Sequence, residues 1–273
     1  MKSIHKFILF AAANIILVSC QDVIEIELRD SDRRYVIEGA VTQGVDSAMV
    51  RVSRTTSFFD TSEPEAVTDA QVTLTLPDGS QRILEHEEDG YYMVHGINPE
   101  PNATYSINVQ VAGQTFTASA YMPSAVQLDS LTYQPQDNFF GPPPMGPPRF
   151  NVFLNFQDPM TTNYYRAQYA RNGNLKDDLS DLQLFDDQLN NGNYIQIPIF
   201  NQSYDMGDTV DVALLNMDAS VYTFLETFVS AASADAGSPF SAAPDNPISN
   251  IEGGALGVFA AYSRSEMQVI IVP

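Results

Sequence analysis

Short runs in which apolar and polar residues alternate recur through the first half of the chain. One run covers residues 48–54, and two others, 70–76 and 81–84, flank the tetrapeptide Pro77-Asp78-Gly79-Ser80. Alternation with a period of two is typical of a half-buried β-strand, and an Asp-Gly pair between two such runs is typical of a hairpin turn. The pattern therefore predicts antiparallel strands in this part of the chain.

The same alternation continues as far as Met122, with no helical pattern between the runs. The strands that it predicts cover residues 35–41, 48–52, 70–76, 81–84, 89–94, 104–111 and 115–120. Short strands at this spacing are typical of an antiparallel β-sandwich of the immunoglobulin-like type. We expect this sandwich to form a domain over residues 35–124.

The second half of the chain predicts more strands and then one helix. The strands cover residues 127–133, 150–156, 164–170, 194–200, 208–217 and 267–272. From residue 221 to 232 the apolar residues fall three and four positions apart, which predicts an amphipathic helix capped by Asp218 or Ser220 and ended by Gly237-Ser238-Pro239. We expect a second β-rich domain over residues 125–273, with the apolar helix face covering one side of its sheet; a partner-binding helix is the alternative.

Two loops of unusual composition interrupt this second half. Residues 139–148 contain five prolines, which favour an extended loop over a strand or helix. That loop either connects two strands, the interpretation that we favour, or presents Phe139, Phe140 and Met145 to a partner. Five aspartates between residues 177 and 187 precede Gly192 and could bind calcium, but the order of ligands in a calcium-binding loop is missing, so a polar loop is favoured.

The N-terminal segment has the pattern of a lipoprotein signal peptide. Lys2 and Lys6 precede the apolar residues 7–17, and Leu17-Val18-Ser19-Cys20 follows the order that is typical of cleavage before a lipid-modified cysteine. The apolar run is too short to span a bilayer as a permanent helix. We therefore expect a signal peptide over residues 1–19 and a lipidated tether over residues 20–34; an ordinary secretory signal is the alternative.

Cys20 is the one cysteine of the chain. A diacylglyceryl group on its sulfur and a further fatty acid, such as palmitate, on its amino group would together anchor the protein stably in a membrane. With that thiol modified, the mature chain has no cysteine for a disulfide, a thiolate metal site or a nucleophile.

Composition narrows the possible partners. The chain carries 13 Lys and Arg against 34 Asp and Glu, a formal net charge of −21, and loss of Lys2 and Lys6 would make it more acidic. Such a charge repels phosphate backbones, so we expect no nucleic-acid binding. Hydrophobic residues make up 44% of the chain, with 16 Phe and 13 Tyr, which is enough for a packed core.

Few residues of the chain are candidates for a catalytic site. His5 lies in the expected signal peptide, and neither His86 nor His95 stands near a nucleophilic serine or at a metal-ligand spacing. The glycines between 253 and 257 lack the lysine of a phosphate-binding loop. We therefore expect no enzyme, cofactor or metal site, although a glycosidase needs only two carboxylates that a sequence cannot pair.

The order of several short motifs resembles a family of Bacteroidota outer-membrane lipoproteins known as domain of unknown function 4249. The motifs are Tyr35 to Gly39, residues 70–76 with Asp78-Gly79, Gly90-Tyr91, Thr104-Tyr105, Leu184-Phe185-Asp186-Asp187, Ser249-Asn250-Ile251, Gly254, Leu256-Gly257 and Phe259. The proline-rich residues 141–148 depart from the family pattern. In the last group of motifs the glycines permit a positive φ or a close backbone approach, so we favour a structural role over ligand contact.

The resemblance implies a function at the cell envelope without assigning catalytic residues. It implies a lipoprotein on the outer membrane, facing the cell surface or the periplasm, that accompanies a TonB-dependent β-barrel transporter. We expect an accessory or ligand-binding subunit on the cell surface, with a small molecule, peptide or glycan as ligand. A surface hydrolase with an Asp/Glu pair, or an adhesive or structural envelope protein, is the alternative.

Overall fold

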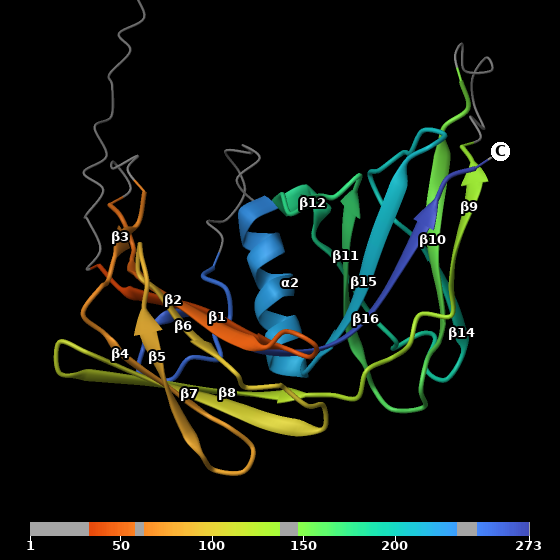
Figure 1. The fold of residues 1–273 in the computed structure, drawn as a ribbon. Helices are drawn as coiled ribbons and strands as arrows, with labels where there is room; N and C mark the ends of the chain where they lie inside the picture. Colours follow the sequence, from red (N-terminus) through yellow and green to blue (C-terminus); the bar gives the residue numbers. More distant parts are fainter. Residues whose placement is uncertain (1–32, 58–62, 137–146, 234–244, 273) are drawn as a thin grey trace, which may run out of the picture. The chain divides into compact units, whose positions relative to one another are not determined.

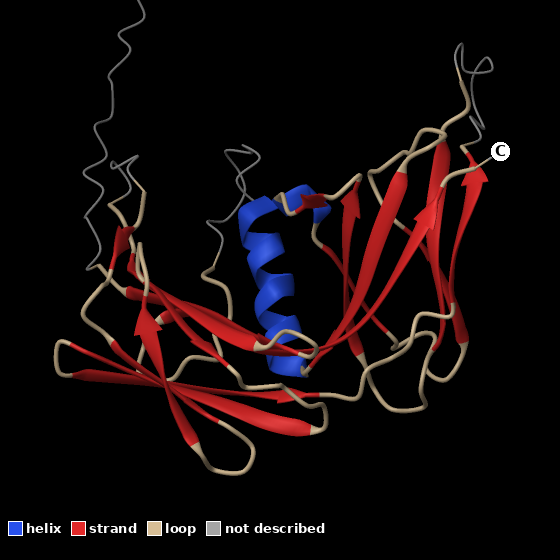
Figure 2. Ribbon diagram, in the orientation of Figure 1, coloured by secondary structure: helices blue, strands red, loops and turns tan. Residues whose placement is uncertain are grey.

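The computed structural model describes residues 33–57, 63–136, 147–233 and 245–272, which belong to one compact unit. Strands dominate these residues, and one α-helix and one short 3₁₀-helix lie among them (Figures 1 and 2). A mainly β fold with one amphipathic helix is confirmed. The expected signal peptide, most of the tether, and residues 137–146 of the proline-rich region lie outside the described residues, as do residues 237–239.

The larger sheet has thirteen strands among the described residues. Its main path runs, in spatial order, through β12 (Asn174–Lys176), β11 (Tyr164–Arg171), β15 (Thr209–Met217), β16 (Leu256–Ile270), β1 (Tyr35–Thr42), β2 (Ser47–Arg54), β6 (Tyr91–His95), β5 (Gln81–His86), β4 (Gln71–Thr75), β7 (Ala103–Val111) and β8 (Gln114–Met122). Off this path, β13 (Gln183–Asp186) pairs with β11, and β3 (Glu65–Ala66) pairs with β2.

The smaller sheet consists of β14 (Tyr194–Pro198), β10 (Phe150–Gln157) and β9 (Ser130–Pro135). The 3₁₀-helix η1 (Leu179–Asp181) lies between β12 and β13, and α2 (Ala219–Ser233) follows β15. Helix α2 packs against β11, β13 and β16 (Figure 1). Its first turn is capped by Asp218, whose Oδ1 accepts hydrogen bonds from the backbone of Ser220 and Val221.

The final strand connects the two halves of the larger sheet. Residues 256–262 of β16 pair in parallel with β1, and residues 263–270 pair antiparallel with β15. The remaining pairs of the larger sheet are antiparallel, and they include every pair within residues 35–124, where an antiparallel sandwich is expected. Two segments from opposite ends of the sequence can pair in parallel because the whole intervening chain serves as their connection.

Two clusters of buried side chains form the core. The first lies between the strands β1, β2, β6 and β16 and the strands β4, β7 and β8, and it draws on residues 35–122 together with residues 215–262. The second lies between β11, β15, the end of β16 and the smaller sheet. Strand β16 serves both, since Phe259 is buried in the first cluster while Met267 packs against the second.

Some segments that the sequence predicts to be loops contain short strands or a short helix in the structure. The acidic segment after residue 173 contains β12, η1 and β13. The last strand begins at Leu256, eleven positions before the expected start at Met267. Both segments lack a clear alternation of apolar and polar residues, and pairing with a neighbouring strand holds them extended: β12 and β13 pair with β11, and the start of β16 pairs with β1.

Candidate functional site

A groove of about 550 Å³ runs between α2 and the outer face of β1, β2, β6 and β16. This size lies within the range of small-ligand sites, roughly 300–1,000 Å³. Its apolar wall includes Phe224 and Phe228 of α2 and Met49 of β2. Phe228 and Met49 are 41% and 42% exposed, which is unusual for large apolar side chains that lie on one concave surface.

Strand alternation determines which side chains reach the groove. In β2, Val50 and Val52 are fully buried in the first core cluster, so Met49 and Arg51 between them point to the opposite face. In β11, Tyr165 and Ala167 are buried in the second cluster, and Arg166 points to the side of α2. Two strands from different halves of the chain thus each place an arginine on one groove.

Neither groove arginine forms an ion pair within the described residues. The guanidinium of Arg51 lies 5.2 Å from the centre of the Tyr91 ring, a cation–π contact. Arg166 lies beside the phenol of Tyr262. Burial raises the pKa of that phenol, while the charge of the guanidinium and a hydrogen bond between the two side chains oppose the rise. The Nε atoms of both arginines are buried without a hydrogen-bond partner.

Three carboxylates also line the groove, and all three belong to exposed residues. They are Glu38 of β1 and Asp177 and Asp178, which precede η1. Glu38 stands opposite Arg51 in the register of β1 and β2, yet the two side chains form no ion pair. The half-buried guanidinium groups and the exposed carboxylates therefore give the groove both signs of charge.

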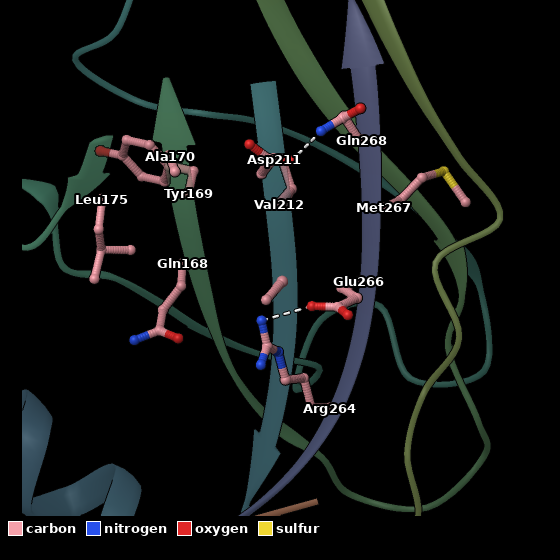
Figure 3. A pocket seen from close by; sticks show the side chains of 11 residues that line it. Gln168, Tyr169, Ala170, Leu175, Asp211, Val212, Arg264, Glu266, Met267 and Gln268 are labelled. Carbon is pink, nitrogen blue, oxygen red and sulfur yellow. Dashed lines mark hydrogen bonds and ion pairs between the residues drawn. The ribbon is translucent and has the colours of Figure 1, made fainter. Parts of the chain in front are cut away.

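A second pocket, of about 440 Å³, lies on the same side of the sheet over β11, β15 and β16 (Figure 3). Its polar side chains bind one another: Arg264 pairs with Glu266 at 2.6 Å, and Gln268 donates to Asp211 (Figure 3). Paired groups gain little from a ligand that must displace their partners. The groove beside α2, whose two arginines form no ion pair within the described residues, is therefore the better candidate site.

The aspartates of the acidic loop are divided between the surface and the interior. Asp177 and Asp178 line the groove, whereas Asp181 accepts hydrogen bonds from Tyr169 and Gln202. Asp187 accepts one from the backbone of Asn163. No three His, Cys, Asp or Glu residues come together as a possible metal site in the described part of the chain.

Asp158, another buried carboxylate, lies near Asp187 and was not identified from the sequence. Tyr165 donates a hydrogen bond to it, and burial followed by this bond raises the pKa of the Tyr165 phenol. Burial and then the charge of Asp158 raise the pKa of Asp187, against the effect of its backbone hydrogen bond. Both aspartates are nearly inaccessible, at 2% and 1%, and their hydrogen bonds join loops. We assign them a structural role.

The two groove arginines, Arg51 and Arg166, could not be identified as site residues from the sequence. Alternation in 48–54 places Arg51 on a polar face, but nothing in the sequence pairs that face with Arg166. Cys20, the expected lipidation site, lies outside the described residues. Among the helices of the described part, none has the length and apolar character that crossing a membrane requires.

A protein-family profile described as "Domain of unknown function (DUF4249)" matches residues 21–268. The chain belongs to the DUF4249 family. The match includes every described strand apart from the end of β16, and it contains all the residues that line the groove. No curated protein matches the chain. Membership of DUF4249 therefore assigns no reaction and no site residue.

Two solved structures show a distant similarity to this DUF4249 chain. One is the native conformation of Escherichia coli alpha-2-macroglobulin, at 10% identity and a TM-score of 0.25, covering 73% of this chain and 14% of that one. The other comprises the FN1–FN3 domains of chicken CNTN1, at 10% identity and a TM-score of 0.23, covering 68% and 61%. Neither similarity indicates a function.

Proposed function

We propose that this DUF4249 protein is a lipid-anchored outer-membrane protein of Bacteroidota that binds a ligand as an accessory subunit of a TonB-dependent uptake system. The groove beside α2 carries the binding part of the proposal. It combines exposed apolar side chains, such as Phe228, with Arg51 and Arg166, which lack carboxylate partners. Unpaired charge in a concave apolar site favours a ligand that supplies the missing partner.

The chemistry of the groove supports binding over hydrolysis. Buried carboxylates with altered pKa values, such as Asp187, lie in the interior and hold loops together. The groove carboxylates, Glu38, Asp177 and Asp178, belong to exposed residues. A general acid for glycoside cleavage is usually a carboxyl group whose pKa is raised by an apolar site, so a binding role is favoured.

The lipid anchor rests on the sequence around Cys20. Leu17-Val18-Ser19-Cys20 follows an apolar run, and the family match begins at residue 21. An anchored protein stays close to its membrane partner, which raises its effective concentration there. Ligand captured in the groove would then be released next to the transporter.

Co-purification from a native host tests the proposal. The full chain, with a C-terminal tag, would be extracted in mild detergent beside an unrelated tagged lipoprotein as control. We expect a TonB-dependent β-barrel to be enriched with the DUF4249 chain alone. Recovery of no such barrel, or equal recovery with the control, would count against the transport role.

A substitution at Cys20 tests the lipid anchor separately from the transport role. Cys20→Ser is expected to abolish incorporation of labelled palmitate and to release the protein from the membrane fraction. Ser19→Ala, which keeps a small residue before the cleavage site, serves as the matched control and should behave as the wild type. Membrane retention of Cys20→Ser without lipid would show that the anchor lies elsewhere.

A further inference from the structure

We propose that two loops, residues 158–163 and 187–193, insert the side chains of Met160 and Leu189 into the surface of a zwitterionic lipid bilayer. This inference goes beyond the groove and rests on the lipid anchor of the proposed function, because the bilayer in question is the one that Cys20 would hold close. Four properties of the loops lead to it: their placement, the exposure of their apolar tips, the hydrogen bonds that hold them and their lack of charge.

The two loops lie at the same end of four strands. The first connects β10 to β11, and the second connects β13 to β14. Gln157, the last residue of β10, pairs with Tyr194, the first residue of β14. Tyr164, the first residue of β11, pairs with Asp186, the last residue of β13. Both loops therefore begin and end at one level, at the lower end of β10, β11 and β14 in Figure 1.

Each loop carries one large apolar side chain that extends into solvent. Met160 is 88% exposed and Leu189 is 90% exposed, whereas no other large apolar side chain in the described residues exceeds 59%. The stem of Met160 lies beside the second loop, since its Cγ is 3.2 Å from the place of a Cβ on Gly192. Leu189 stands three residues before Gly192, so their Cα atoms are at most about 11 Å apart. The two tips thus belong to neighbouring parts of one surface.

Hydrogen bonds from buried groups hold the two loops against each other. The carboxylate of Asp158 accepts a bond from the N–H of Gly192 at 2.9 Å, and the carboxylate of Asp187 accepts one from the N–H of Asn163 at 2.8 Å. The N–H of Asp158 also donates to the carbonyl of Asn193 at 3.0 Å. Loops that are fixed in advance lose little conformational entropy when they bind. The support therefore favours loops that bind a surface over loops that only connect strands.

The loop tips carry no charge, although the chain is strongly acidic. Residues 159–163 and 188–193 contain no Asp, Glu, Lys or Arg, while the net charge of the whole chain is −21. Their polar residues are Thr, Asn and Gln, which can form hydrogen bonds with lipid headgroups and the water around them. Because the rest of the chain repels anionic lipids, a zwitterionic surface is the one that we expect the tips to approach.

A bilayer fits these tips better than a protein pocket does. The centre of a protein interface is packed as closely as a protein interior, so a protein partner would have to offer a fitted recess for each protruding side chain. A bilayer accepts apolar side chains wherever they protrude, and burial of each one is favourable. Tyr194, which follows the second loop and is 58% exposed, is of a residue type that is enriched at membrane–water interfaces.

The expected anchor would bring the loops within reach of the membrane. Residues 20–32 separate the lipidation site from the compact unit, which begins at Arg33. A chain of this length can span up to about 45 Å when it is extended. A weak contact is sufficient, since the anchor raises the effective concentration of the loops at the membrane. The contact would fix the orientation of the anchored unit on the bilayer.

The absence of tryptophan from the chain allows a direct test, because a single Trp can report the surroundings of each loop. Met160→Trp and Leu189→Trp are made separately in the full lipidated chain, which is reconstituted in phosphatidylcholine vesicles. We expect lipid that is brominated on its acyl chains to quench the emission of both variants at least about twofold more strongly than that of a control. Both positions are exposed, so the variants should fold as the wild type does.

Leu175→Trp is the matched control. Leu175 is 54% exposed and pairs with Ala170 of β11, whereas the loops adjoin Tyr164 at the start of that strand. The two positions on β11 are about 20 Å apart along the strand. The control should therefore remain in water while the loop variants contact lipid. Equal quenching of all three variants, or no quenching of the two loop variants, would overturn the proposal.

The same variants distinguish lipid from a protein partner. If brominated lipid alone leaves the emission of the loop variants unchanged, and addition of a co-purified β-barrel shifts it, the tips contact protein and the lipid proposal is wrong. The anchor and the transport role are read separately. Incorporation of palmitate without quenching would mean that the anchor is right and the loop contact wrong, and quenching without recovery of a barrel would mean the loop contact is right and the transport role wrong.

Discussion

Asn250 binds the backbone of Phe259 through both atoms of its side-chain amide. Its Nδ2 donates to the Phe259 carbonyl at 2.7 Å, and its Oδ1 accepts from the Phe259 N–H at 3.0 Å. The side chain thus occupies the place of a neighbouring strand at the start of β16. Ser249 adds a bond from its Oγ to the carbonyl of Gly257. These contacts give the Ser249-Asn250 motif a structural role, as the sequence analysis favoured.

Replacing Asn250 should therefore destabilise the fold. Asn250→Ala leaves the N–H and carbonyl of Phe259 without partners, and we expect a loss of about 1–3 kcal/mol in the free energy of unfolding. Urea titration followed by circular dichroism measures it. Asn246→Ala, at an exposed position of the same segment, should change stability by less than about 0.5 kcal/mol. Equal stability of the two variants would contradict the role of Asn250.

Gly257 should tolerate no side chain. Its φ is +101°, and a Cβ at this position would lie 2.0 Å from the carbonyl oxygen of Ile37 in the paired strand β1. Gly257→Ala therefore combines backbone strain with a clash against backbone that cannot move without breaking the β1–β16 pairing. We expect the chain to fail to fold or to unfold at a far lower urea concentration.

Gly254→Ala is the matched control for that prediction. Gly254 also has a positive φ, of +91°, but nothing lies within 4 Å of an added Cβ. Gly254→Ala should therefore lower the free energy of unfolding only by the backbone strain, about 1–2 kcal/mol. If both alanine variants unfold at the same urea concentration, the close approach of Gly257 to Ile37 does not limit which side chain the position accepts, and the prediction is wrong.

Asp208 should make stability depend on pH. Burial alone raises the pKa of its carboxyl group, but hydrogen bonds from Asn172 and the Asp205 backbone and the ion pair with Arg171 outweigh burial and lower it. A lowered pKa in the folded state means that the carboxylate stabilises the fold above the unfolded pKa. This stabilisation is lost as the pH falls through the lowered pKa.

Asp208→Asn tests this dependence. At pH 7 we expect the variant to be less stable than the wild type by about 1–3 kcal/mol. The difference should shrink as the pH falls below the ordinary range of aspartate. Urea titrations from pH 7 to pH 3 give the comparison, with the exposed Asp129→Asn as control. A constant difference at every pH would show that the charge of Asp208 has no part in it.

Asp218 should stabilise α2 and with it the helical wall of the groove. One carboxylate oxygen caps the helix, and the other accepts a hydrogen bond from the backbone of Tyr121 at 2.7 Å. Asp218→Ala should cost about 2 kcal/mol, because capping alone contributes up to that amount. Thermal and urea unfolding measure the loss.

Ser220 provides the control for the cap. Its hydroxyl also contacts Asp218 Oδ1, but its removal leaves the backbone donors of the cap in place. Ser220→Ala should therefore cost less than about 0.5 kcal/mol. If Ser220→Ala lowered the free energy of unfolding as much as Asp218→Ala does, the Ser220 hydroxyl, and not the backbone cap, would account for the stability of the helix start.

Most strands could be predicted because their signal is local. Residues 104–111 and 115–120 alternate clearly, and β7 and β8 occupy residues 103–111 and 114–122. The helix behaves likewise, since Val221, Phe224 and Leu225 are buried on one face as their spacing predicts. The short strands β12 and β13 were missed because their polar residues are extended only through pairing with β11.

The candidate site was not predictable for a different reason. Arg51 and Arg166 belong to strands far apart in the sheet, and α2 closes the groove between them. Whether an arginine has a carboxylate partner depends on side chains from distant parts of the chain. Glu38 stands opposite Arg51 and forms no ion pair with it, which no local pattern indicates.

The sequence by itself determined the mainly β class and the position of the helix, because both depend on residues close together in the chain. It also determined the family, which is identified by residues 21–268. It left the helix cap open between Asp218 and Ser220, and the structure assigns the cap to Asp218. The tertiary structure alone decided that β16 joins β1 to β15, and that two arginines share a groove. Such long-range pairings follow from the burial of many side chains at once, since alternation gives each strand a buried face without specifying its partner.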